Sequence, residues 1–272
     1  MTIQRVASKW AKTKILLKNK GLVSYVPSTR QYSLEALEDM LGTHKLVYIK
    51  PDRGTYGIGV MSVEQLHSQN ADADADETTT TSYKLRYEQK TEIFTSLEGL
   101  HKTLSTLFQG QTYLIQQGIH LLSHKGNPFD LRVLTQKSPS GQWVSTGIIG
   151  RVAANNKIIT NHHSGGVVQH YKPLMTEHMT AEEAENIRRE LNTLGVNVAA
   201  QLQKSYPNLK EIGLDIAIDK SWNIWILEVN TKPALFPFKK FFKDPSIYKQ
   251  VKKYATAYGR NLSTKKKAKK TG

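Results

Sequence analysis

Residues 45–63, KLVYIKPDRGTYGIGVMSV, join two apolar strands through a glycine-rich loop. The first strand ends at Lys50, so its backbone is fixed while its side chain can reach outward. Gly54, Gly57 and Gly59 allow close backbone approach and positive φ angles. Exposed N–H groups in such a loop bind phosphate oxygens, and an ammonium group beside them adds positive charge. The stretch therefore predicts a phosphate-binding loop; the alternative is a glycine-rich hairpin with a lysine that reaches into solvent.

The spacing K-P-x-x-G-x-x-G-x-G differs from the two common nucleotide-binding loops. The P-loop GxxxxGK[ST] and the dinucleotide loop GxGxxG both lead into a helix. The loop after Lys50 leads instead into the apolar strand VMSV, residues 60–63. The sequence thus predicts a strand, a glycine-rich loop and a second strand, an arrangement that neither of these two motifs describes.

The stretches IGLDIAI (212–218) and WNIWILEVN (222–230) predict a second hairpin. Side chains alternate between the two faces of a strand, so Glu228 and Asn230 share a face. A tight turn at 219–221 brings Asp215 on the partner strand near that face. Two carboxylates and an amide oxygen are hard ligands that suit Mg²⁺, which usually bridges to nucleotide phosphates. The alternative is that Lys or Arg side chains neutralise these carboxylates.

Two arginines are candidate anion clamps. Arg132 shares a strand face with Asp130, and an arginine fork oriented by a carboxylate suits phosphate or carboxylate groups. Arg151 lies at the end of the strand expected over 143–152. The alternatives are a plain Asp130–Arg132 salt bridge and a surface position for Arg151.

The rest of the chain predicts a mixture of helices and antiparallel hairpins, which is typical of the α+β class. ADADADETTTTS (71–82) is polar and of low complexity, so we expect an exposed loop. The remaining expected elements have caps or apolar periodicity in common: a helix in residues 1–20 with Ile3, Val6, Trp10 and Leu17 on one side, helices that begin near Ser33 and at Thr95 or Ser96, strands at 112–119, 130–137 and 143–152, and a helix that opens with a Thr180/Glu183 capping box.

The composition is that of an ordinary soluble protein, with 39% hydrophobic and 22% charged residues among 272. No apolar run approaches the roughly 18 residues of a membrane span. The first residues lack the apolar stretch of a secretory signal, so we expect a cytoplasmic protein. The chain has no cysteine, which excludes disulfides, cysteine zinc sites and thiol nucleophiles.

The net charge of +15 comes from the two ends of the chain. Residues 1–20 hold six basic residues and no acid, and residues 239–272 hold twelve basic residues and one acid, whereas the middle is slightly acidic. A lysine run such as 265–270 is usually a solvated tail. The alternative is contact with a polyanion, which would be sensitive to salt.

A lysine–glycine phosphate cradle, a later arginine and a terminal Asp…Glu-x-Asn set together describe a site for ATP with Mg²⁺ or Mn²⁺. Their order resembles the ATP-grasp superfamily, and within it the YheC/YheD family of endospore coat-associated proteins. The resemblance covers residues 9–240. It is carried by YIKPDRGTYGIGV (48–60), LIQQGI (114–119), PFDLRVLTQK (128–137), the stretch from GQWVSTGIIGRVA to GG (141–166) and EIGLDIAIDKSWNIWILEVNTKP (211–233).

The resemblance implies two α+β subdomains that clasp the nucleotide. It divides the chain into an N-terminal helical segment (1–45), a lid subdomain with the glycine-rich loop (46–118), a C-terminal subdomain with the metal site (119–245) and a basic tail (246–272). About 45 residues precede the first ATP-grasp strand, so the N-terminal domain common in the superfamily is expected to be missing or reduced.

The resemblance also implies roles for individual residues. Arg132 and Arg151 would be catalytic, with Arg132 on the transferred phosphate or an acyl-phosphate. The backbone after Gln116 would read the adenine edge; many relatives have glutamate at this hinge. Lys9 is a candidate for a further phosphate contact from the N-terminal helix. The cofactor-binding residues would be Lys50, Arg53, Gly54, Thr55, Gly57, Gly59, Gln116, Gln117 and Ile119, and the metal ligands Asp215, Glu228 and Asn230.

The implied activity is an ATP-dependent ligase that joins a carboxylate to an amine or thiol through an acyl-phosphate. The partners would be a small-molecule or peptide carboxylate and an amine acceptor. His162 and His163, in a glycine-containing loop, could line the acceptor site. A second hypothesis is a non-catalytic, nucleotide-binding structural protein of the spore coat, and a third is nucleic-acid binding through the lysine-rich tail.

Overall fold

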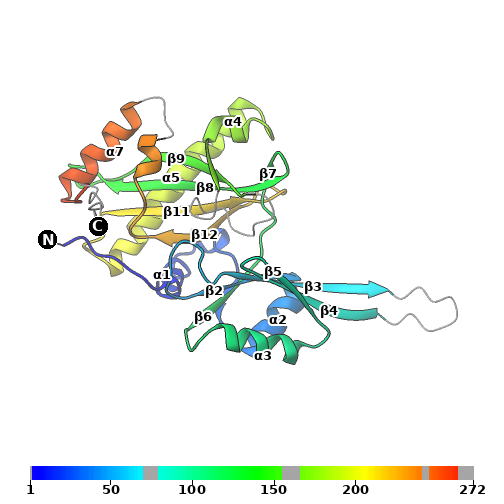
Figure 1. The fold of residues 1–272 in the computed structure, drawn as a ribbon. Helices are drawn as coiled ribbons and strands as arrows, with labels where there is room; N and C mark the ends of the chain where they lie inside the picture. Colours follow the sequence, from blue (N-terminus) through cyan, green and yellow to red (C-terminus); the bar gives the residue numbers. More distant parts are fainter. Residues whose placement is uncertain (1, 70–78, 155–165, 241–244, 263–272) are drawn as a thin grey trace, which may run out of the picture.

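The computed structural model describes residues 2–69, 79–154, 166–240 and 245–262. These residues form two antiparallel six-stranded sheets, each with helices packed against it (Figure 1). The arrangement confirms the α+β class. Within the described ranges no helix is both long and apolar enough to cross a membrane. His162 and His163 lie outside these ranges.

The first sheet has the strand order β1-β6-β2-β3-β4-β5. Helices α2 (Leu34–His44) and α3 (Leu97–Leu107) pack against it (Figure 1). Strand β2 alternates, so Val47 and Ile49 are buried in the core with these helices while the residues between them face the other way. The strands are β1 (Thr29–Gln31), β2 (Leu46–Pro51), β3 (Met61–Gln69), β4 (Thr79–Tyr87), β5 (Lys90–Phe94) and β6 (Tyr113–Gln117).

The second sheet has the order β10-β9-β8-β11-β12, and β7 pairs with β8. The long helix α5 (Ala181–Ser205) and the short helix α4 (Tyr171–Met175) pack over one face. Leu131, Val133 and Leu214 point into this core. The strands are β7 (Ser123–His124), β8 (Asn127–Lys137), β9 (Trp143–Val152), β10 (Val167–His170), β11 (Glu211–Ile218) and β12 (Ile224–Asn230).

Helices α6 (Phe236–Lys240) and α7 (Pro245–Ala257) cover one end of the opposite face of the second sheet. Val251 and Ala255 of α7 are buried against Leu134 of β8. Residues 246–262 were expected in a basic tail, and this expectation is wrong for them because an apolar stripe of α7 packs on the sheet. Residues 263–272 of that tail lie outside the described ranges.

The N-terminal helix α1 (Lys9–Leu16) is shorter than expected. Residues 2–8 are not helical, because their backbone bonds to other segments: Gln4 N–H donates to Asn208 O at 3.1 Å, and Val6 N–H donates to Thr231 Oγ1 at 2.8 Å. A 3₁₀ turn, η1 (Val23–Tyr25), follows. Helix α1 contacts α5, β1 and β12, so it lies between the two halves of the molecule.

The predicted helix starts are confirmed. Ser33, Ser96 and Thr180 are the N-cap residues of α2, α3 and α5, and each side chain accepts a hydrogen bond from a backbone N–H of the first turn. Thr180 and Glu183 form the reciprocal capping box. Local side-chain chemistry therefore sets where these helices begin.

The two sheets divide the chain near the predicted subdomain boundary. The connection between β6 and β7 contains residues 118 and 119. Residues 1–45 do not form a separate unit, because β1 and α2 belong to the first sheet and its cover. The polar stretch 71–82 is part strand, since β4 begins at Thr79, and β3 and β4 form a hairpin that projects from the body (Figure 1).

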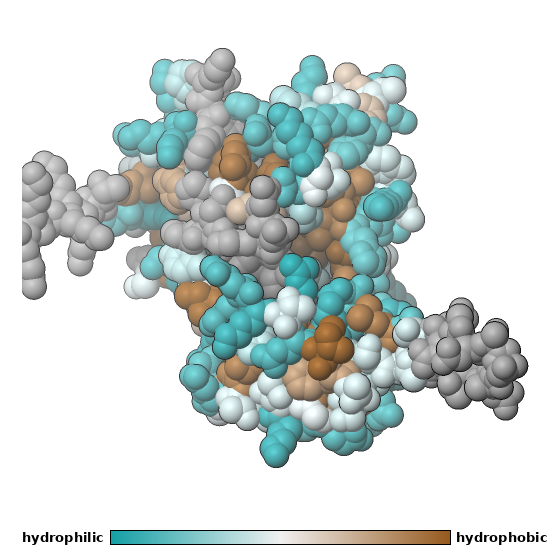
Figure 2. Space-filling model, turned by 45° about the vertical axis from the view of Figure 1, so that its right-hand side comes forward, coloured by the Kyte–Doolittle hydropathy of each residue, from teal (hydrophilic) through white to brown (hydrophobic). Residues whose placement is uncertain are grey.

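The halves meet at a hollow. On the face shown in Figure 2, hydrophilic residues cover most of the surface, and hydrophobic residues form separate patches on both halves. Both faces toward it are the sheet faces left uncovered by α2, α3 and α5. Polar side chains on those two faces, outside the part that α6 and α7 cover, are therefore turned toward the other half.

Candidate functional site

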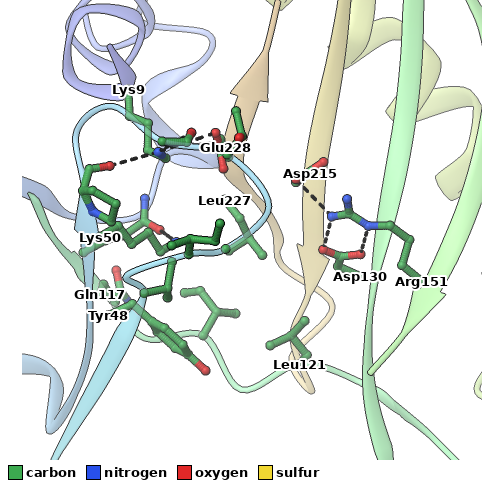
Figure 3. A pocket seen from close by; sticks show the side chains of 18 residues that line it. Lys9, Tyr48, Lys50, Gln117, Leu121, Asp130, Arg151, Asp215, Leu227 and Glu228 are labelled. Atoms are coloured by element: carbon green, nitrogen blue, oxygen red, sulfur yellow. Dashed lines mark hydrogen bonds and ion pairs between the residues drawn. The ribbon is translucent and has the colours of Figure 1, made fainter. Parts of the chain in front are cut away.

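A cleft lies between the two sheets, with about 830 Å³ of space free of protein atoms when the open solvent at its mouth is included. Its wall contains side chains from α1, β2, β6, β8, β9, β11 and β12 (Figure 3). The lining residues are Lys9, Tyr48, Lys50, Pro51, Gly54, Thr55, Gly57, Ile58, Val60, Gln116, Gln117, Ile119, Leu121, Asp130, Arg151, Asp215, Leu227 and Glu228.

Lys50 is held in place on the first wall. Its Nζ donates to Gln116 Oε1 at 2.6 Å, and Gln116 Nε2 donates in turn to Thr29 Oγ1 at 3.1 Å. The ammonium also lies 5.5 Å from the centre of the Tyr48 ring. Burial lowers the pKa of Lys50 to about 8, although Glu228 opposes this shift. A half-buried lysine with a lowered pKa and no full counter-charge is suited to an anionic ligand.

The glycine-rich loop between β2 and β3 borders the same cleft. Gly57 and Gly59 have φ angles of 75° and 73°, a region that favours glycine. A Cβ atom on Gly59 would lie 2.8 Å from the hydroxyl of Tyr113, so this position also requires close packing. Ile58, at the loop tip, is 74% exposed. The loop thus presents backbone groups to the cleft while its tip stays open to solvent.

Asp215 lies on the second wall between two arginines. Arg132 Nε donates to its Oδ1 at 2.5 Å, and Arg151 Nη2 lies 3.0 Å from its Oδ2. Burial raises the pKa of the Asp215 carboxyl, but the two guanidinium groups outweigh burial and hold the pKa below its ordinary value. The carboxylate is therefore ionised at neutral pH, and arginine side chains neutralise it in this structure, as the alternative interpretation of the hairpin expected.

Asp130 orients Arg151 rather than Arg132. Arg151 Nε donates to Asp130 Oδ1 at 2.7 Å, and the two residues lie opposite each other on β8 and β9. The alternative of an Asp130–Arg132 salt bridge is therefore wrong, and so is a surface position for Arg151, which is buried. Burial lowers the pKa of Arg151, but Asp130 and Asp215 raise it above its ordinary value.

The predicted metal ligands come together on the hairpin of β11 and β12. Asp215 is directly opposite Glu228, and Asn230 Nδ2 donates to Asp215 Oδ2 at 3.4 Å. Ile216 pairs with Ile226, which leaves Leu227 as the extra residue of a β-bulge. Because of the bulge, the adjacent side chains of Leu227 and Glu228 both line the cleft.

These three residues fit a magnesium ion by their donor chemistry. Two carboxylates and one amide oxygen are the ligand types that Mg²⁺ prefers. Glu228 is 26% exposed, and its Oε1 lies 3.9 Å from Lys9 Nζ. In the part of the chain that the structure describes, no three His, Cys, Asp or Glu side chains are grouped so that they could hold a metal ion.

The other predicted residues divide by position. Lys50, Gly54, Thr55, Gly57, Gln116, Gln117, Ile119, Arg151, Asp215 and Glu228 line the cleft, as does Lys9. Arg132 and Asn230 do not line it but touch Asp215. Arg53 and Gly59 belong to the loop without lining the cleft. The adenine contact expected after Gln116 stays a prediction; the Gln116 side chain itself binds Lys50.

Several lining residues were missed, and Tyr48 and Leu227 show two different reasons. Tyr48 is two residues before Lys50 on the same strand, so the alternation of β2 could have placed it in the cleft. Leu227 should face away from Glu228 by the same rule, and only the bulge turns it inward. Lys12, behind the wall, is buried beside Lys50 and Glu228 in a smaller cavity, and burial lowers its pKa to about 8.

The fold and this site define an ATP-grasp protein. A search of solved structures finds D-cycloserine synthetase DcsG, with a TM-score of 0.54 and 11% identity over 93% of this chain and 70% of that one. It also finds the C-terminal domain of K. lactis Pby1, described as an ATP-grasp enzyme that interacts with the mRNA decapping enzyme Dcp2. The TM-score there is 0.48 at 15% identity, over 91% of this chain and 72% of that one.

Within this class, the chain belongs to the YheC/D-like ATP-grasp family, whose model matches residues 1–262. The endospore coat-associated proteins YheD and YheC of Bacillus subtilis (strain 168) are 26% and 24% identical to it, over 89% and 83% of this chain. The chain spans 50% of the length of YheD and 60% of that of YheC. The resemblance and fold expected from the sequence are thus confirmed.

Proposed function

We propose that the cleft binds ATP with Mg²⁺ and that the chain is an ATP-dependent ligase. One observation carries the proposal: Lys50 with its glycine-rich loop and the Asp215–Glu228 hairpin, about 165 residues apart in sequence, line one cleft from opposite sides. A phosphate cradle facing a set of hard oxygen ligands is the arrangement that a metal–triphosphate complex needs.

Different residues on the two walls of the cleft would bind different parts of such a nucleotide. Lys50 and the backbone of the glycine-rich loop would hold phosphate oxygens. The side chains of Tyr48, Ile119 and Leu121 offer apolar surface for a base. Asp215, Glu228 and Asn230 would hold Mg²⁺, which when bound neutralises phosphate charge.

The proposed reaction is a ligation in two steps. A substrate carboxylate oxygen attacks the γ-phosphorus of ATP, which forms an acyl-phosphate and releases ADP; an amine or thiol then attacks the acyl carbon and releases inorganic phosphate. Arg132 and Arg151 would stabilise the charge on the transferred phosphoryl group. Arg132 supports this role: its Nε binds Asp215, and in the described residues its terminal nitrogens have no hydrogen-bond partner.

Asp130 and Gln116 would be positioning residues for this chemistry. Asp130 fixes the guanidinium plane of Arg151, and Gln116 fixes the ammonium of Lys50. A reaction without a side-chain nucleophile depends on placement and charge, so groups fixed before substrate binds lower the cost of reorganisation.

The relatives' names support a second candidate for where and how the chain acts. YheD and YheC are endospore coat-associated proteins. By likeness, this chain could be a spore-associated nucleotide-binding protein that turns over nothing, and the proposed cytoplasmic ligase is distinguished from it by turnover. The polyanion contact of the lysine-rich end remains a separate proposal.

The test is a screen for ADP release in the presence of Mg²⁺. Amino acids, short peptides and cell-wall fragments serve as carboxylate and amine substrates. We expect ADP release that depends on a substrate pair, and loss of at least 100-fold in Glu228→Gln because a metal ligand is gone. Glu38→Gln, an exposed glutamate on α2, is the control and should keep full turnover. Tight MgATP binding without ADP release for any pair would favour the structural protein.

A further inference from the structure

Residues 4–10, which we call the strap, connect the second sheet to the base of the glycine-rich loop. At one end the strap is bonded to the second half of the molecule: Gln4 N–H donates to Asn208 O at 3.1 Å, and Val6 N–H donates to Thr231 Oγ1 at 2.8 Å. Thr231 directly follows the proposed metal ligand Asn230. The strap is therefore fixed beside the hairpin of β11 and β12, which carries the proposed metal ligands.

The other end of the strap is bonded to Asp52, just before the glycine-rich loop. Ser8 Oγ donates to Asp52 Oδ1 at 3.0 Å, and Trp10 N–H donates to the same oxygen at 2.8 Å. Lys9 N–H donates to the carbonyl oxygen of Asp52 at 2.9 Å. Since Ser8 is also the N-cap of α1, the start of this helix and the base of the loop form one hydrogen-bonded unit.

Lys9 stands where the strap crosses from one half to the other. Its Nζ donates to the carbonyl oxygens of Pro51 at 2.9 Å and Gly54 at 3.3 Å, and it lies 3.9 Å from Glu228 Oε1 (Figure 3). The side chain is 11% exposed and lines the cleft. A single ammonium group thus joins two loop carbonyls to the strand that carries Glu228.

We propose that Lys9 is a positioning residue that holds the glycine-rich loop against the hairpin of β11 and β12. When nucleotide binds, the ion pair between Lys9 and Glu228 breaks and Glu228 binds the divalent cation. The role rests on the proposed function of the cleft. It has two consequences of opposite sign. Lys9 organises the loop for phosphate, which favours nucleotide, and its positive charge beside Glu228 opposes a divalent cation by Coulomb repulsion.

The experiment compares Lys9→Met with Lys9→Arg, which keeps the charge, and with Lys14→Met, an exposed lysine on the same helix. Three quantities are measured: the affinity of the nucleotide-free protein for Mn²⁺, the affinity for ATP in EDTA, and the rate at which an arginine-specific protease cleaves after Arg53. Arg53 is exposed in the loop, so its cleavage reports how firmly the loop is held.

We expect Lys9→Met to bind Mn²⁺ about fivefold more tightly and metal-free ATP about tenfold more weakly, as one lost charge near a partly exposed site implies. Cleavage after Arg53 should accelerate at least threefold. Lys9→Arg should keep Mn²⁺ affinity near that of the wild type, and Lys14→Met should match the wild type in all three.

Affinities for Mn²⁺ and ATP that fall together, or that both stay unchanged, would overturn the proposal, as would unchanged cleavage after Arg53. The failure of the proposed function looks different. A wild-type protein that binds no ATP refutes the ATP site, while the Mn²⁺ and protease measurements still decide the role of Lys9.

Discussion

Strand β11 carries two carboxylates, Glu211 and Asp215, on the same face, and each lies between two arginines. Glu211 Oε1 is 2.7 Å from Arg5 Nη2, an ion pair without hydrogen-bond alignment, and Glu211 Oε2 is 2.6 Å from Arg260 Nη1. Asp215 has Arg132 and Arg151 in the same places. By residue type and pairing the two clusters are alike.

What covers the two clusters is different. Glu211 is fully buried and also accepts a hydrogen bond from Tyr258 at 2.6 Å, in the segment after α7. Asp215 is 10% exposed and lines the cleft. Gly213 separates them: a Cβ there would meet Pro233 at 2.9 Å and Arg132 at 3.1 Å, so both pack directly on the strand.

A carboxylate between two arginines is therefore not by itself a sign of function. The Glu211 cluster joins the N-terminal segment, through Arg5, and the C-terminal segment, through Arg260, to the loop after β12. The Asp215 cluster has the same charges, but Asp215 is open to the cleft. Access to the cleft, rather than pairing, marks the site.

The largest expected effect is on the stability of the buried cluster. Glu211→Gln leaves Arg5 and Arg260 without their counter-charge, and removing one partner of a buried ion cluster costs roughly 3 kcal/mol. Asp215→Asn should cost less, about 1 kcal/mol, since Arg151 keeps Asp130 as its counter-charge, but should abolish Mg²⁺-dependent nucleotide binding. Urea unfolding and MgATP titration check both. If both variants lost the same unfolding free energy, burial of the Glu211 cluster would not distinguish it from the Asp215 cluster.

A smaller effect is expected from Lys50 on the facing wall. Its pKa is about 8 in the folded protein against an ordinary 10.5, so the unfolded chain binds more protons between these values and stability rises with pH across that window. Lys50→Met should therefore be more stable than the wild type at pH 7, by about 1–2 kcal/mol after allowance for partial exposure. The difference in unfolding free energy between Lys50→Met and the wild type should become smaller as the pH rises above 8. Unfolding free energies at pH 7, 8 and 9 measure it.

The same titration should appear in nucleotide affinity. A protonated Lys50 favours phosphate, so wild-type affinity for ATP should fall about tenfold from pH 7 to pH 9, and the affinity of Lys50→Met should change far less. A wild-type affinity that is flat over this range would place Lys50 outside the phosphate contact. Lys12, with its own pKa of about 8, adds to the slope that remains in the variant.

The fold was largely predictable because local signals and tertiary packing agree over most of the chain. Residues close together in the sequence determine the helix caps at Ser33 and Thr180 and the alternation of side chains along β2 and β11. The predictions were wrong where local sequence signals and tertiary packing disagree. Ile3 and Val6 have helical spacing, yet the backbone of residues 2–8 bonds to distant segments. In α7 the lysines hide an apolar stripe, Ile247, Val251 and Ala255, that was readable at helical spacing.

The site was predictable as far as one strand or hairpin specifies it. Lys50 and the pair Asp215–Glu228 follow from strand alternation and a tight turn. The partners of the arginines do not, because Asp130 meets Arg151 through the register of β8 and β9, which no short motif fixes. The bulge at Leu227 and the crossing of the strap at Lys9 are also products of packing between segments far apart in sequence.

The smallest expected effect concerns the lysine run beyond the buried cluster. Residues up to 262 belong to the packed end of the chain, since Arg260 binds Glu211 and Leu262 packs with α7. Deletion of 263–272 should therefore change the unfolding free energy by less than about 0.5 kcal/mol and leave ATP affinity intact. Binding to polyphosphate at low salt should weaken, because five lysines are lost.

Deletion of 259–272 is the matched comparison, since it removes Arg260 as well and should cost roughly 2 kcal/mol by leaving Glu211 with one arginine. The two truncations differ by four residues that include Arg260, so their difference in stability measures the buried cluster directly. If the shorter deletion destabilised the protein as much as the longer one, the lysine run would itself be part of the packed structure, and the boundary at residue 262 would be misplaced.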